Sequence, residues 1–326
     1  MTLSMTRRHF NAAIAGAAAG AFASMTGPAR AETTLNFQSI WLNDPEFLGY
    51  MLAIDKGYYA AEGLKVNYLP GGPNLIPEGS LLAGKADIAL TTVITTASAV
   101  ADKGAGLKII GTQYQKSPAG FVSLASTGIS GPKDLIGKTV AVSTLASSTV
   151  QAFLKINGIT PDQIHIVPYQ FNPTPLINGE VDAVVDFVTQ LPFLVEKASG
   201  KKVNSFLIYD YGLKLYIDLV TVTDTALKTK RADLVKFLRA SRKGWKENFA
   251  DPGKYPPLYH DTWFKGTGST VEAETYFNKT QLALMDSPSG IYAMTEEGIA
   301  RNIEALDKLG IKAKRDLFDT TLLAEV

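Results

Sequence analysis

The sequence contains no cysteine. It therefore has no disulfide, no thiolate metal ligand, no cysteine nucleophile and no cysteine to carry a lipid anchor. It has only three histidines, His9, His165 and His260, and they lie far apart along the chain. We therefore expect neither a histidine-based metal site nor a resident cofactor. The formal net charge of +1 gives no electrostatic reason to expect binding to nucleic acid or to an anionic membrane surface.

Motifs of the common enzyme classes are also missing. The sequence has no Walker A loop, no G-x-G-x-x-G after a strand, no G-x-S-x-G elbow and no H-E-x-x-H helix. Acidic residues are plentiful, but no pair has a local spacing that predicts acid–base catalysis. We favour structural roles for Asp87 and Asp182, as turn or cap contacts. The chain is thus expected to bind a ligand, and an exported enzyme that uses the same site is the less favoured alternative.

The N-terminus has the pattern of a targeting segment, residues 1–31. Arg7 and Arg8 form a twin arginine, a weakly apolar run extends from Asn11 to Met25, and Ala29-Arg30-Ala31 offers a cleavage site. The run is too short and too poor in leucine and isoleucine for a membrane-spanning helix. A Sec signal with two adjacent arginines is the alternative. Either route predicts a mature protein that starts near Glu32, soluble in the periplasm and not lipid-anchored.

After residue 31 the chain alternates strand-like and helix-like segments separated by turn residues. This order predicts an α/β fold with mainly parallel sheets. We expect two lobes: residues 32–121 begin lobe 1, residues 122–220 form lobe 2, and residues 221–326, mostly helical, complete lobe 1. Such a type II-like two-lobe arrangement would have a hinge of two strand-like crossings, at Phe121–Leu124 and Leu219–Thr223, with a ligand between the lobes.

A weak internal repeat supports two related lobes. Ala83-Gly84-Lys85-Ala86-Asp87-Ile88-Ala89-Leu90 matches Asn178-Gly179-Glu180-Val181-Asp182-Ala183-Val184-Val185 at an offset of 95 residues. In both places the preceding strand ends in a turn that contains proline. The same order of elements around both matches makes coincidence less probable than the short motif alone would suggest.

The segment from Trp41 to Val66 combines local signals for a strand end, a capped helix and a second strand. Asp44 is suited to cap the helix and Pro45 to occupy its first position. Gly57 should end the helix, and Gly63 should turn the chain into the next strand. An aromatic residue and two acids, Asp44 and Glu46, would thereby lie at a helix N-terminus.

Polar and aromatic residues gather at the predicted carboxyl ends of strands, where open α/β sheets bind ligands. This set suits a planar, polar heteroaromatic solute, because aromatic faces stack on a ring while amides and hydroxyls satisfy its edge. The residues from Thr144 to Thr149 could instead hold an anion at a helix start, or serve as a plain cap. The candidate ligand-binding residues are Trp41, Asn43, Asp44, Gly71, Gly72, Asn74, Thr91, Thr92, Tyr114, Ser143, Thr144, Ser147, Ser148, Asp186, Phe187 and Gln190.

Several motifs together resemble the periplasmic solute-binding proteins of ABC importers. They are Trp41…Asp44-Pro45-Glu46-Phe47-x-Gly49-Tyr50, Lys56-Gly57-Tyr58-Tyr59, Pro70-Gly71-Gly72-Pro73, Leu82-x-Gly84-x-Ala86-Asp87 and Leu135-x-Gly137-Lys138-Thr139-Val140. The resemblance covers essentially all of the mature chain, and the group concerned includes binders of pyrimidine precursors of thiamine, riboflavin, sulfonates and nitrate.

This resemblance implies a monomer that binds its solute by hinge closure and delivers it to an ABC permease with its ATPase. It also implies that Trp41 stacks on a pyrimidine or flavin-like ring. Pyrimidine-precursor binders tend to carry a glutamate where this chain has Gln190, which weighs against an aminopyrimidine. A sulfonate or nitrate-like anion is the alternative ligand. Eukaryotic thiamine-pyrimidine synthases share the fold but carry a cysteine-rich iron motif, so this chain does not look like one.

Overall fold

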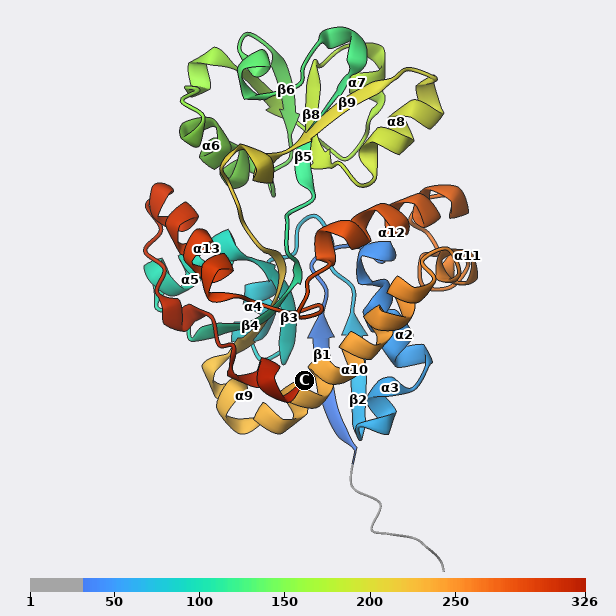
Figure 1. Cartoon of the computed structure of the whole chain (residues 1–326), viewed down its shortest axis with the longest axis vertical. Helices are drawn as coiled ribbons and strands as arrows, with labels where there is room; N and C mark the ends of the chain where they lie inside the picture. Colours follow the sequence, from blue (N-terminus) through green and yellow to red (C-terminus); the bar gives the residue numbers. More distant parts are fainter. Residues whose placement is uncertain (1–31) are drawn as a thin grey trace, which may run out of the picture. The chain divides into compact units, whose positions relative to one another are not determined.

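The computed structural model describes residues 32–326, and the targeting segment expected at residues 1–31 lies outside them. Two five-stranded β-sheets organise the described residues (Figure 1). We call the first sheet with its helices lobe 1 and the second with its helices lobe 2. The α/β class and the two-lobe arrangement expected from the sequence are confirmed.

The lobe 1 sheet has the strand order β2-β1-β3-β10-β4. Strand β1 pairs in parallel with β2 and β3, whereas β10 is antiparallel to both β3 and β4. The strand that returns from lobe 2 therefore lies inside this sheet. The strands are β1 (Thr33–Gln38), β2 (Leu64–Leu69), β3 (Ile88–Thr92), β4 (Leu107–Tyr114) and β10 (Ile217–Thr223).

The lobe 2 sheet has the order β7-β6-β8-β5-β9 and repeats this plan. Strand β6 pairs in parallel with β7 and β8, whereas β5 is antiparallel to β8 and β9. Each sheet is thus mixed, because the strand that follows a crossing, β5 in lobe 2 and β10 in lobe 1, runs antiparallel to both of its neighbours. The strands are β5 (Ala119–Leu124), β6 (Thr139–Val142), β7 (His165–Pro168), β8 (Ala183–Phe187) and β9 (Val203–Leu207).

The hydrogen-bonded registers locate the two crossings between lobes. Phe121–Leu124 lies wholly within lobe 2, since β5 pairs with β8 and β9, and Leu219–Thr223 lies wholly within lobe 1. The linking residues are therefore 115–118 and 208–216, each a few residues earlier than the sequence indicated. Strand propensity correctly identified the two strands that follow the crossings. It could not show which sheet each of these strands would join.

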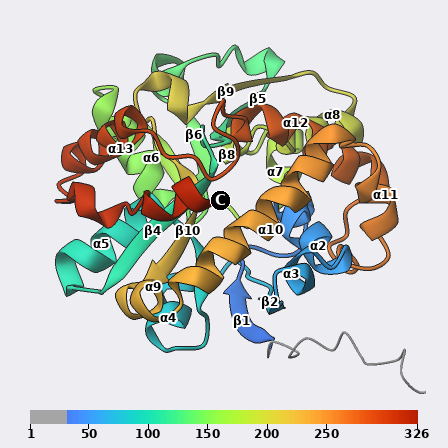
Figure 2. The same ribbon diagram turned by 60° about the horizontal axis from the view of Figure 1, so that its bottom comes forward.

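One face of the lobe 1 sheet is covered by α2 (Leu48–Asp55), α3 (Tyr58–Ala61) and α10 (Arg231–Ala250), as Figure 2 shows. Helices α2 and α10 cross at two glycines. A Cβ on Gly244 would lie 2.0 Å from the carbonyl oxygen of Gly49, and a Cβ on Gly49 would lie 2.3 Å from the ring of Trp245. Glycine is required at both positions because the two helix backbones approach so closely.

The other face of this sheet carries α4 (Pro77–Leu82), α5 (Val93–Lys103) and α13 (Glu296–Lys308), whereas α9 (Asp224–Thr229) packs against the same core as α10. Helices α11 (Tyr255–Tyr259) and α12 (Val271–Met285) follow α10, and lobe 2 holds α6 (Ser147–Ile156), α7 (Thr174–Asn178) and α8 (Leu191–Ser199). Helices α7 and α12 have the bounds expected from the sequence, whereas the short α9 and α11 were not predicted. Within residues 32–326, no helix combines the length and apolar character needed to cross a bilayer.

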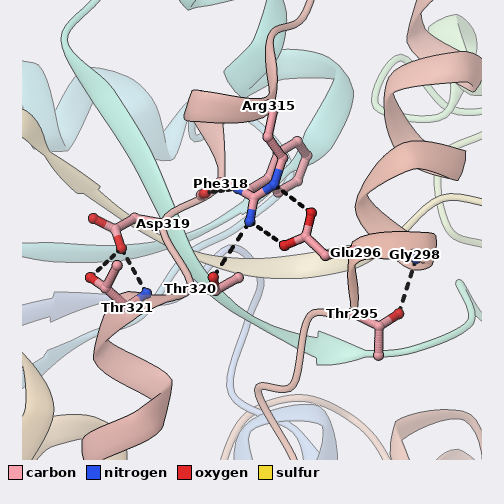
Figure 3. A network of polar contacts seen from close by, with 8 residues as sticks. All are labelled: Thr295, Glu296, Gly298, Arg315, Phe318, Asp319, Thr320 and Thr321. Carbon is pink, nitrogen blue, oxygen red and sulfur yellow. Dashed lines mark hydrogen bonds and ion pairs between the residues drawn. The ribbon is translucent and has the colours of Figure 1, made fainter.

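The C-terminal segment is fastened to lobe 1 by the polar network in Figure 3. Nε of Arg315 donates to Glu296 at 2.8 Å, and Oδ1 of Asp319 accepts from the backbone N–H of Thr321 at 2.8 Å. Phe318 is buried and pairs through its backbone with Ile109 of β4. Because the ion pair is largely exposed, the buried Phe318 contributes more to holding the segment.

Asp87 and Asp182 make the same contacts in their two lobes. Oδ2 of Asp87 accepts from the N–H of Asn36 at 2.8 Å, and the N–H of Asp87 donates back to the Asn36 carbonyl. Asp182 forms the same pair of bonds with Thr139. The structural roles expected for both acids are confirmed, and the repeat corresponds to a repeated strand-to-strand clamp.

Candidate functional site

Trp41 lies three residues beyond β1, in a bend held by a glycine turn. Its carbonyl oxygen accepts from the N–H of Gly71 and from the hydroxyl of Ser39, both at 2.8 Å. A Cβ on Gly71 would lie 2.4 Å from the carbonyl carbon of Ile40, so a larger residue would push the two segments apart. This turn fixes the backbone from which the half-buried indole projects.

The ring of Trp41 contacts an aromatic residue of lobe 2. The ring centroids of Trp41 and Phe171 are 4.7 Å apart and the ring planes are tilted by 55°. Phe171 in turn lies 5.4 Å from Tyr169, whose hydroxyl donates to Asp186 at 2.9 Å. A continuous chain of contacts therefore leads from Trp41 in lobe 1 to a carboxyl group in lobe 2.

Asp44 caps the short helix that precedes α2, as the sequence predicted. Its Oδ1 accepts from the N–H of Glu46 at 2.8 Å, and Pro45 occupies the first helical position. Burial raises the pKa of Asp44 from 3.8 to about 8, and the carboxylates of Asp218 and Glu274 also raise it, whereas the hydrogen bond from the Glu46 N–H lowers it. Asp44 is the partly exposed member of a group of acids at this helix start.

Behind Asp44 lies a buried pair of carboxyl groups, Glu46 and Asp218. Glu46 is 4% and Asp218 is 1% exposed. Burial raises the pKa of Asp218 to about 6 and that of Glu46 well above its usual range, where the charge of Asp218 adds to the effect. Two ionised carboxylates would repel each other, so this pair favours the protonated form of at least one carboxyl group.

Asp218 owes its position to an irregularity in β10. The pairing register shifts between Ile217 and Leu219, and Asp218 has a left-handed φ of 54°. The amide of buried Gln113 donates to Asp218 at 3.1 Å and to the carbonyl oxygen of Glu46 at 2.8 Å. This bulge and the bonds from Gln113 bring strand β10 and the helix start at Glu46 together.

No positive charge balances these acids within residues 32–326. Four carboxyl groups, those of Asp44, Glu46, Asp186 and Asp218, take part in none of the ion pairs there. The charge of Asp186 also raises the pKa of Glu46, which links the lobe 2 acid to the lobe 1 group. The site is therefore acidic, poorly hydrated and bordered by aromatic rings. It favours a partner that donates hydrogen bonds and disfavours an anion.

Several residues predicted to touch a ligand form internal contacts instead. Thr91 is fully buried and its hydroxyl bonds to Thr221 at 2.7 Å, while Tyr114 is fully buried and donates to Gln281 at 2.6 Å. The side chain of Thr92 caps α5. The side chains of Thr91 and Tyr114 are thus buried in this structure, and the ring of Tyr114 also lies 6.4 Å from that of Phe187 in lobe 2.

The other predicted residues divide into two groups. Asn43 and Gly72 lie beside Trp41, partly buried, and Asn74 is exposed in the following turn. In lobe 2, the hydroxyl of Ser143 accepts from the N–H of Ala146 at 3.2 Å, within the turn that precedes α6. The residues that remain at or near the surface of lobe 2 are Thr144, Ser147, Ser148, Asp186, Phe187 and Gln190.

The candidate list omitted Glu46, Gln113, Phe171 and Asp218. Glu46 had a signal, because it stands two residues after the Asp44 cap. Gln113 also had a signal, because it stands beside Tyr114 at the predicted carboxyl end of a strand. Asp218 and Phe171 had none, since Asp218 lies 172 residues beyond Glu46 and Phe171 lies 130 residues beyond Trp41. A separate surface pocket of about 310 Å³, lined by Arg242, Thr295 and Thr320 among others, lies in lobe 1 beside the network of Figure 3.

Comparison with known proteins agrees with this architecture. The model of the family described as "NMT1/THI5 like" matches residues 44–255. The chain is 25% identical to the riboflavin-binding protein RibY of Chloroflexus aurantiacus, over 64% of this chain and 60% of that protein. It is 26% identical to the formylaminopyrimidine-binding protein of Halalkalibacterium halodurans, over 62% of each.

A relative with an enzyme's name also matches. The chain is 27% identical to the 4-amino-5-hydroxymethyl-2-methylpyrimidine phosphate synthase of Legionella pneumophila, over 63% of this chain and 66% of that protein. The aligned regions thus span less than two thirds of these relatives. Among solved structures, the periplasmic aliphatic sulphonate binding protein SsuA of Escherichia coli has a TM-score of 0.66 at 15% identity, over 87% of this chain and 96% of that one. This likeness shows the fold alone.

Proposed function

The chain belongs to the NMT1/THI5-like family, and on that premise we propose that it is the extracytoplasmic solute-binding component of an ABC importer. The proposed ligand is a small heteroaromatic solute whose ring edge carries amino or ring N–H donors, such as a pyrimidine precursor of thiamine or a flavin. Closure of the lobes would bury the solute, and the closed form would be the one that the permease recognises.

The uncompensated acids carry this proposal. Asp44, Glu46, Asp186 and Asp218 gather beside the Trp41–Phe171 pair without a cation. A ring stacked on Trp41 with a donor edge toward Asp44 would supply the hydrogen bonds that the acids lack. Pyrimidine-precursor binders tend to carry a glutamate where this chain has Gln190. The acids of this site offer a ring amine a carboxyl partner from other elements.

The same acids argue against a sulfonate or nitrate-like ligand. An anion would enter next to Asp186, which is ionised above its pKa of about 6 and is paired with no arginine or lysine within residues 32–326. Like charges close together cost several kcal/mol. The likeness to the sulphonate binding protein reflects the fold.

Ligand-induced thermal shifts test the proposal, because a solute that binds the folded state raises its melting temperature. The panel contains flavins, aminopyrimidines, purines, alkanesulfonates and nitrate. We expect shifts with donor-bearing heteroaromatic compounds only. Asp44→Asn should weaken their binding, by about 1–3 kcal/mol for loss of a charge-assisted hydrogen bond, while the exposed-site control Asp261→Asn should match the wild type.

Two results would reject this function. Shifts confined to sulfonates or inorganic anions would show that the acids do not face the ligand. Conversion of a bound compound to product by the purified protein, followed by mass spectrometry, would assign the chain to the enzymes among its relatives.

A further inference from the structure

Phe171 has an unusual backbone and an unusual exposure. It lies in the turn between β7 and α7 with a left-handed φ of 56°, which is disfavoured for a residue that carries a Cβ. Its side chain is 40% exposed, so burial in a core does not explain the conformation. Local strain of this kind persists where the surrounding structure holds a side chain in a particular place.

The Phe171 side chain is held against the face of Trp41. The Phe171 ring lies between Trp41 of lobe 1, at 4.7 Å, and Tyr169 of its own lobe, at 5.4 Å. Tyr169 is 5% exposed and its hydroxyl is bonded to Asp186, so the support beneath Phe171 is fixed. The left-handed turn therefore aims an exposed ring across the boundary between the lobes.

We propose that Phe171 is the lobe 2 wall of the ligand site and selects for flat rings, with the ligand held between Trp41 and Phe171. This inference rests on the proposed function. A direct centroid separation of 4.7 Å leaves no room for a third ring, since each stacked pair needs roughly 4.5–7 Å. Trp41 and Phe171 belong to different lobes, so movement at residues 115–118 and 208–216 can open the gap. The contact between Trp41 and Phe171 is then replaced by two contacts, one between the ligand and each of these rings.

The polar groups around this gap fit the same arrangement. Asp44 follows Trp41 by three residues on one wall, and Asp186 lies behind Phe171 through Tyr169 on the other. A ring between the walls would therefore have Asp44 near its edge, while Asp186 holds the Tyr169 side chain that supports the lobe 2 wall. A saturated, puckered ring could reach Asp44 as well but could not lie flat against two aromatic faces.

A second aromatic pair across the lobes supplies a matched control. Phe193 of α8 and Tyr276 of α12 are stacked with centroids 4.5 Å apart. The neighbouring contacts are structural: Lys197 pairs with Glu272 at 2.7 Å, and the hydroxyl of Thr280 donates to the carbonyl of Thr189 at 2.7 Å. Removing Phe193 takes away an aromatic contact between the lobes without touching the proposed gap.

The experiment measures dissociation constants by calorimetry for the wild type, Phe171→Ala, Phe171→Leu, Phe171→Tyr and Phe193→Ala. The probes are a flavin, an aminopyrimidine and a dihydropyrimidine of the same polar pattern. Both Phe171→Ala and Phe171→Leu should weaken the flat ligands by about 3- to 10-fold. Phe171→Tyr should restore wild-type affinity, and the dihydropyrimidine should bind all proteins equally. Phe193→Ala should bind like the wild type.

The outcomes separate this inference from the function on which it rests. If the wild type binds flat ligands and Phe171→Leu binds them equally well, the proposed role of Phe171 as the lobe 2 wall is refuted and the proposed function stands. Tighter binding by Phe171→Leu would also overturn the inference, because Phe171 would then compete with the ligand for Trp41. If the wild type binds no heteroaromatic compound, both fail. Melting temperatures of the free variants check that each one folds.

Discussion

Replacing Asp218 by asparagine should stabilise the folded protein at high pH. The side chain is 1% exposed and its pKa is raised from 3.8 to about 6 by burial. Each pKa unit corresponds to ~1.4 kcal/mol, so the ionised Asp218 lowers the free energy of unfolding by at most ~3 kcal/mol. Asparagine tolerates a left-handed φ, so the 54° backbone angle should not offset the gain.

The direction of the pH dependence follows from proton affinity. The folded protein holds the Asp218 proton more tightly than the unfolded chain does. Its stability is therefore fullest below the unfolded pKa of 3.8 and falls as the pH rises through about 6. The advantage of Asp218→Asn should be small near pH 4 and should reach about 1–3 kcal/mol near pH 8. Gln113 can still donate to the amide oxygen of the variant.

Urea unfolding followed by circular dichroism at both pH values measures this difference. The exposed-site control Asp261→Asn should show no pH-dependent advantage. An Asp218→Asn advantage that is equal at both pH values, or a variant less stable than the wild type near pH 8, would refute the reasoning. Such a result would mean that the folded protein compensates the carboxylate. If the prediction holds, the protein retains a destabilising acid, as expected where function requires it.

Three further substitutions test the packing and the repeat. Gly244→Ala should lower the free energy of unfolding by about 1–3 kcal/mol, because its Cβ would lie 2.0 Å from the Gly49 carbonyl oxygen. A melting temperature equal to that of the wild type would show that α2 and α10 can separate without cost. Asp87→Ala and Asp182→Ala should each cost about 1–3 kcal/mol by leaving a strand N–H unpaired, and hydrogen exchange at Asn36 and Thr139 should accelerate. Unchanged exchange at either amide would show that the clamp does not form in that lobe.

Local chemistry predicted much of the fold. The Asp44–Pro45 helix start, the positive φ angles at Gly57 (68°) and Gly63 (74°), and the bounds of α12 follow from residues that act on their immediate neighbours. Caps, turns and helix periodicity are properties of short segments, so a single sequence reveals them.

The candidate site was less predictable because distant residues build it. The Glu46–Asp218 pair depends on a register shift in β10, and the Trp41–Phe171 contact depends on how two lobes meet. Neither leaves a local pattern. The strand ends at Thr91 and Tyr114 could be predicted, but the burial of both side chains could not, because it depends on the residues that pack around them. The ligand contacts of all the candidate residues stay predictions.

The internal position of β10 bears on the order in which the chain folds. Lobe 2 draws its whole sheet from one continuous stretch, residues 119–207, whereas the lobe 1 sheet lacks the strand between β3 and β4 until residue 223 is available. Because contacts close in sequence cost less entropy to form, we expect the inserted lobe to acquire its sheet first. Pulsed hydrogen exchange during refolding would then protect β5 and β8 before β3 and β4. The reverse order would show that β1, β2 and β3 form a stable nucleus without β10. Late completion of lobe 1 would leave the face of α2 that packs on α10 exposed until residue 250 has been made.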